Sequence, residues 1–60
     1  MKTYMSLTTL ELIENAAAAK RAGDLAGLAA WGRLLHRKAL KVGLGMSLEQ
    51  AAVEIERRAA

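Results

Sequence analysis

Apolar residues recur at intervals of three and four along most of this chain, which is the spacing of one face of an α-helix. β-Branched residues are few and alanine is frequent, so local preferences also favour helix over strand. The pattern divides into three segments, and we predict helices over about residues 8–22, 24–42 and 47–59. The predicted fold class is therefore all-α, with one small helical domain over residues 1–60.

The residues at the ends of the first two segments indicate where the helices start and stop. Thr8 and Glu11 form a capping box, in which each side chain accepts a hydrogen bond from the backbone of the other residue. Gly23 can adopt the left-handed conformation that closes a helix, and Asp24 directly after it is a good N-cap. A connection this short predicts an antiparallel helical hairpin.

The connection to the third segment has similar signals. The second helix is expected to end at Gly43, with Leu44 folding back onto Ala39 as the hydrophobic contact of a Schellman cap. Ser47 and Gln50 repeat the capping-box pattern at the start of the third helix. The third helix has only a narrow apolar stripe, so we expect it to dock loosely or to cover one end of the hairpin.

Each of the first two helices carries an apolar half when its residues are plotted at 100° per residue. Two faces of this width expose more apolar surface than one partner helix covers, so we predict a two-fold dimer with a four-helix core. The residues expected in this core or at the dimer seam are Leu10, Ile13, Leu28, Leu35, His36 and Val42.

Composition supports self-association. Of the 60 residues 32 are apolar, but 13 of these are alanine, so the core has few large side chains. A domain this small usually needs disulfides, a metal or oligomerisation for stability. The chain has no cysteine and a single histidine, which excludes disulfides and thiolate metal sites, and we expect no cofactor.

Residues suited to catalysis are scarce, so we expect that this protein is not an enzyme. Glu11 and Glu14 share a helix face, but a solvated face explains them better than a catalytic pair. The glycines follow no phosphate-binding spacing. His36 lies on the apolar side of the second helix, which is typical of a packed core or interface residue. The alternative is a pH switch at the dimer seam, where two protonated histidines would repel one another.

A basic stripe on the second helix is the strongest functional signal. Arg33, Arg37 and Lys41 are spaced four residues apart and project from one face. Trp31 at its margin is either a core residue or an anchor for another protein, and Leu34 lies among the cations, where it is not expected to reach the core of Leu35. These five residues, Trp31, Arg33, Leu34, Arg37 and Lys41, are our predicted partner-binding face.

The partner class follows from charge. A net charge of +3 and an acidic third helix favour a protein with an acidic or mixed surface over a nucleic-acid duplex, although a nucleic-acid-binding dimer using the same stripe remains the alternative. A helix-turn-helix reading fails because Glu49 stands where that motif buries an apolar residue. No apolar run is long enough for a signal peptide or a membrane span, so we expect a soluble cytoplasmic protein without membrane association.

In its size and its alanine-rich helices the chain is similar to small accessory proteins of phages and mobile elements, anti-CRISPR inhibitors among them. The similarity rests on size and helical character, and no functional residue is carried over from it. It implies a small regulator that binds and modulates, for example inhibits, another protein or protein machine.

Overall fold

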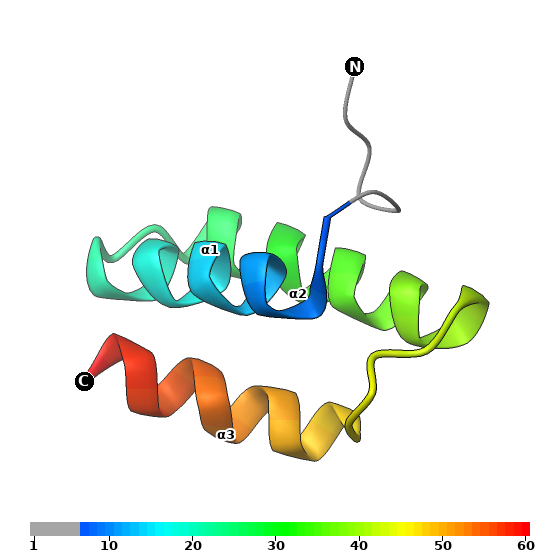
Figure 1. Cartoon of the computed structure of the whole chain (residues 1–60). Helices are drawn as coiled ribbons and strands as arrows, with labels where there is room; N and C mark the ends of the chain where they lie inside the picture. The colour runs from blue at the N-terminus through cyan, green and yellow to red at the C-terminus, as the bar shows by residue number, and fades with distance from the viewer. Residues whose placement is uncertain (1–6) are drawn as a thin grey trace.

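The computed structural model describes residues 7–60, so residues 1–6 of the predicted domain lie outside the described residues. It contains three helices, α1 (Thr9–Arg21), α2 (Leu25–Lys41) and α3 (Leu48–Ala59), and residues 7–60 form no strand. The prediction of an all-α fold is confirmed. α1 and α2 form an antiparallel hairpin, and α3 runs back in the same general direction as α1 (Figure 1).

The predicted start of α1 and the predicted turn between α1 and α2 are both confirmed in atomic detail. The Thr8 hydroxyl accepts from the Glu11 amide at 3.0 Å, and the Glu11 carboxylate accepts from the Thr8 amide at 2.8 Å. Gly23 has φ +75° and closes α1, while the Asp24 carboxylate accepts from the Gly27 amide at 2.9 Å and caps α2. The caps of both helices therefore depend on hydrogen bonds between residues close in the sequence, which form without any tertiary contact.

The connection to α3 follows the prediction in part. Gly43 has φ +86° and ends α2, and the Ser47 hydroxyl accepts from the Gln50 amide as an N-cap. The reciprocal half of the second capping box was predicted wrongly, because the Gln50 side chain donates to Glu54 at 3.2 Å instead. Leu44 is 8% exposed and belongs to the main core rather than only to a helix cap.

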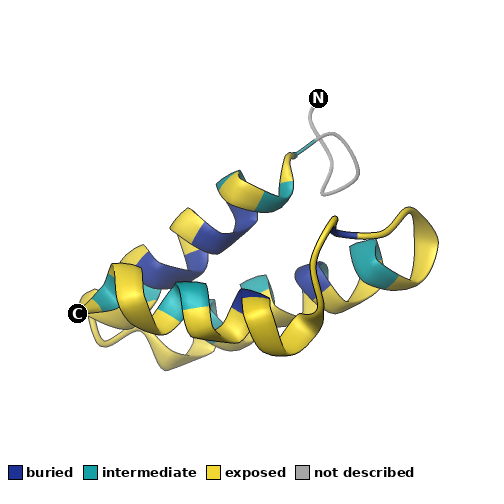
Figure 2. Ribbon diagram, turned by 60° about the horizontal axis from the view of Figure 1, so that its bottom comes forward, coloured by how far each residue is buried: buried dark blue, intermediate teal, exposed yellow. Residues whose placement is uncertain are grey.

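The core is small and centred on α1. Figure 2 shows the buried residues in dark blue on the inner sides of the helices, with most of the outer surface exposed. Only two large side chains, those of Leu12 and Ile13, are almost completely buried. The buried hydrophobic residues are Leu12, Ile13, Ala16, Ala17, Leu35, Leu44 and Ala51.

Three residues predicted in the core or at the dimer seam lie outside the core of the single chain. Leu10 is 49% exposed, because it lies about 90° from the centre of the buried face of α1 at 100° per residue. His36 is exposed because Leu35, its neighbour on α2, points inward. Val42 is the C-cap residue of α2 and is exposed at the end of that helix. For all three, a place at a dimer seam stays a prediction.

Of the other predicted core residues, Ile13 and Leu35 belong to the buried cluster, and Leu28 is half-buried. α1 lies between α2 and α3 and contacts both, whereas α2 and α3 contact one another little. The helical hairpin of α1 and α2 therefore forms the main packing unit.

The position of α3 differs from both expected alternatives, loose docking and covering one end of the hairpin. It packs along α1, where Lys20 of α1 forms an ion pair with Glu56 of α3. Arg58 of α3 also lies 3.4 Å from the Glu14 carboxylate, and Arg21 donates to the Arg58 carbonyl. Polar contacts thus supplement the narrow apolar stripe of α3 that the sequence pattern showed.

Candidate interaction surface

α2 carries an exposed apolar stripe beside its core-facing residues. The exposed fraction is 72% for Leu25 and 76% for Leu40, which are the two ends of this stripe. We call this set the outer stripe; it consists of Leu25, Ala29, Gly32, His36 and Leu40, all exposed. A Cβ built on Gly32 meets nothing within 4 Å, so another backbone can approach the middle of the stripe closely.

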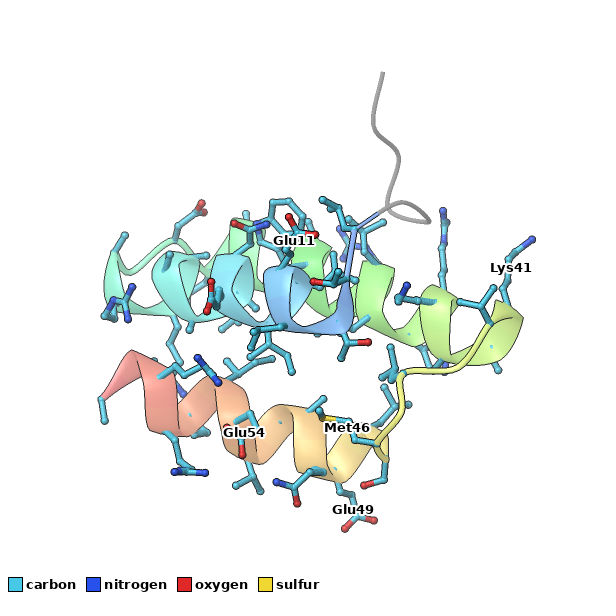
Figure 3. The ribbon with its side chains drawn as sticks, in the orientation of Figure 1. Glu11, Lys41, Met46, Glu49 and Glu54 are labelled. Carbon is cyan, nitrogen blue, oxygen red and sulfur yellow. The ribbon has the colours of Figure 1, made fainter. Side chains whose placement is uncertain are left out.

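The basic stripe of Arg33, Arg37 and Lys41 lies beside the outer stripe on the same helix. All three residues are exposed, and Lys41 points away from the helices at the end of α2 (Figure 3). Within residues 7–60, the side chains of these three cations form no ion pair and no hydrogen bond. Their charges are therefore available to an anionic partner.

Charges on α1 and α3 are arranged differently. Lys20 pairs with Glu56, Arg57 lies 2.9 Å from Glu54, and Arg58 lies between Glu54 and Glu14. Each pair brings opposite charges together on the surface shared by the two helices. The net positive charge of the chain is consequently most accessible on α2.

The two apolar residues of the predicted partner-binding face lie elsewhere. Trp31 and Leu34 are half-buried and pack against the hydrophobic core. The expectation that Leu34 does not reach the core was wrong, because Leu34 packs against the buried cluster together with Leu7, whose carbonyl accepts from Lys38 at 3.0 Å. Of the five predicted residues, only Arg33, Arg37 and Lys41 lie fully on the exposed surface.

The sequence pattern did not lead us to predict the outer stripe as a surface separate from the core-facing residues of α2. Sequence reasoning assigned all apolar residues of α2 to one half of the helix facing one core. The residues that face inward, such as Leu28 and Leu35, follow one row, and Leu25, His36 and Leu40 follow another about 80–100° away. The spacing of four, three, four and four residues along the outer stripe was the available signal.

The remaining polar groups have structural partners. Glu11 completes the capping box and Glu14 pairs with Arg58, so the two carboxylates of α1 act in different contacts. Within residues 7–60, no group of three or more His, Cys, Asp or Glu side chains is placed to hold a metal ion. An open pocket of about 320 Å³ is lined by Glu14, Ala17, Arg21 and Arg58, where Glu14 pairs with Arg58 and the Arg21 side chain donates to the Arg58 carbonyl.

No family model, curated protein or solved structure matches this chain. None of the helices in residues 7–60 combines the length and the apolar character that crossing a membrane requires. The function is therefore argued from the surface of α2.

Proposed function

We propose that this protein is a non-enzymatic helical interaction protein of the cytoplasm that binds another protein and modulates it, for example by inhibition. The docking surface is the basic stripe of α2. One observation carries the proposal: Arg33, Arg37 and Lys41 are exposed in a row without ion-pair partners among residues 7–60, while Lys20 of α1 and the two arginines of α3 pair with acids. Such a row complements an acidic protein surface.

A protein partner is favoured over nucleic acid by the character of the surrounding surface. The net charge is only +3, and α3 is net acidic, with Glu49, Glu54 and Glu56 against two arginines. An acidic helix would repel a nucleic-acid duplex that approached it closely. If the partner is instead nucleic acid, it should bind the same basic stripe, and its affinity should depend more strongly on salt.

The proposal includes a two-fold dimer with a four-helix core, as expected from the sequence. The support is the thin core of the single chain, in which three of the seven buried hydrophobic residues are alanine. Domains below about 70–80 residues rarely gain more than roughly 3–5 kcal/mol from one core. A second copy would bury further apolar surface and stabilise both chains.

Dimerisation predicts that the melting temperature depends on protein concentration. At micromolar concentration, light scattering should give about twice the chain mass of 6.4 kDa. A tenfold increase in concentration favours the folded dimer by about 1.4 kcal/mol, which should raise the melting temperature by roughly 5 °C for a dimer of this size. A melting temperature that stays constant between 1 and about 100 μM would contradict the dimer.

The class of partner is tested by affinity capture from a native lysate of the source cells, with and without nuclease. We expect the same partner protein to be retained in both samples, because the proposed contact is between proteins. Protein identity is read by mass spectrometry and nucleic acid by staining. Loss of all captured proteins after nuclease treatment would instead support the nucleic-acid alternative.

A further inference from the structure

The outer stripe of α2 has a symmetric sequence pattern. Its midpoint lies between residues 32 and 33. Leu25 and Leu40 lie at equal distances from this midpoint, as do Ala29 and His36. In a two-fold interface, residue i contacts residue j of the second copy while j contacts i, so the same stripe must complement itself. When two such stripes meet antiparallel, each leucine faces a leucine, each Ala29 faces a His36, and the two Gly32 residues lie near the centre.

From this pattern and the exposure of these residues we propose that the outer stripe is the seam between two copies of this chain, packed antiparallel through α2. Around the midpoint, Leu25 of one copy lies level with Leu40 of the second, and Ala29 lies level with His36. Gly32 is next to the two-fold axis, where its open surroundings allow close approach of the two backbones. This inference rests on the dimer of the proposed function and identifies its seam.

An interface of standard size would use the whole outer stripe. A specific interface buries about 800 Å² on each partner, which is about a fifth of the 3980 Å² that this chain exposes. α2 has 17 residues, and Leu35 is the one among them that is buried. The outer stripe runs for about 22 Å along this helix, so its full length is needed for an interface of standard size.

Charge also favours the antiparallel arrangement. Asp24 and Lys41 lie at equal distances from the midpoint, so an antiparallel pair places the acidic start of each α2 alongside the basic end of the other. The positive N-terminal end of each α2 is next to the negative C-terminal end of the other, which stabilises antiparallel helices. A parallel pair would bring like charges together at both ends.

The seam explains how the dimer presents its docking surface. The two-fold axis of an antiparallel helix pair is perpendicular to the plane of the two helices, so side chains above this plane in one copy are above it in both. The basic stripe lies on one side of the outer stripe and the core on the other. The dimer therefore gathers six cations on one face, about 25 Å long from Lys41 to Lys41 of the second copy.

Disulfide cross-linking tests the seam, because the natural chain contains no cysteine. Ala29→Cys and His36→Cys are made as separate single variants at exposed positions. In the proposed seam, two copies of either variant place their thiols about 10.5 Å apart along the helix axes, beyond disulfide reach. A mixture of the two variants places Cys at residue 29 level with Cys at residue 36, so only the mixture should form the covalent dimer under mild oxidation.

Gel electrophoresis without reductant measures the covalent dimer, and circular dichroism of the reduced variants checks their helicity. The pair Leu25→Cys and Leu40→Cys should obey the same rule and provides a second register. Cross-linking of a single variant with itself, or a helical mixture that stays uncross-linked and monomeric, would overturn the seam. The test needs no partner, so a failed capture of the partner protein leaves its outcome unaffected.

Discussion

Replacing Leu35 with aspartate is expected to unfold the protein. Leu35 is 3% exposed and is the buried residue that α2 contributes to the core of the single chain. An aspartate there has no cation to pair with inside the apolar cluster, and burying an unpaired charge costs several kcal/mol. That cost is comparable to the whole stability of about 3–5 kcal/mol expected for a domain of this size. Circular dichroism should show loss of most of the helical signal at 25 °C.

The matched control for this prediction is Val53→Asp on α3. Val53 is a β-branched apolar residue of similar size, but it is 50% exposed and lies outside the hydrophobic core. The new carboxylate stays hydrated, so the free energy of unfolding should change by less than about 0.5 kcal/mol. Equal loss of helix in both variants would show that the chain tolerates no added negative charge, and would contradict the role of Leu35 as the inner contact of α2.

Reversing the basic stripe is expected to abolish binding without unfolding the protein. The variant carries Arg33→Glu, Arg37→Glu and Lys41→Glu, three changes at exposed positions that have no partner within residues 7–60. Surface charges contribute little to stability, so helicity and the molecular mass should be retained. Three like charges facing an acidic partner cost several kcal/mol, and we expect affinity for that partner to fall by at least about 100-fold.

Two neutralised variants separate the stripe from net charge. One has glutamine at Arg33, Arg37 and Lys41, and the other has glutamine at Lys20, Arg57 and Arg58 on the α1 and α3 surface. Each substitution removes one positive charge, so both variants fall from +3 to a net charge of 0. Only the first should lose affinity in a calorimetric titration with the captured partner. Equal losses would indicate that net charge, rather than the stripe, attracts the partner.

Salt dependence distinguishes the two classes of partner in the same titrations. Three phosphate contacts per chain predict a log-log slope near −2.7, or roughly a 40-fold loss of affinity between 50 and 200 mM salt. A dimer using all six cations on a duplex would give a slope near −5.4. A protein partner should show a shallower slope, with salt acting mainly on the association rate.

The local sequence was sufficient to predict the helices and most of their ends. Thr8, Gly23, Asp24 and Ser47 act through hydrogen bonds or backbone conformations within a few residues, so their effect is nearly independent of the remaining fold. The basic stripe was predictable for the same reason, because a spacing of four residues places Arg33, Arg37 and Lys41 on one face of any α-helix.

Only the tertiary structure decided how the apolar half of α2 is divided. Periodicity gives the width of an apolar face, but the direction of the core depends on where α1 and the segment at Leu7 pack. Contact with them draws Trp31 and Leu34 inward and leaves Leu25 and Leu40 exposed. The ion pair between Lys20 and Glu56 likewise joins residues 36 positions apart. Such contacts depend on the packing of whole helices, which local spacing does not encode.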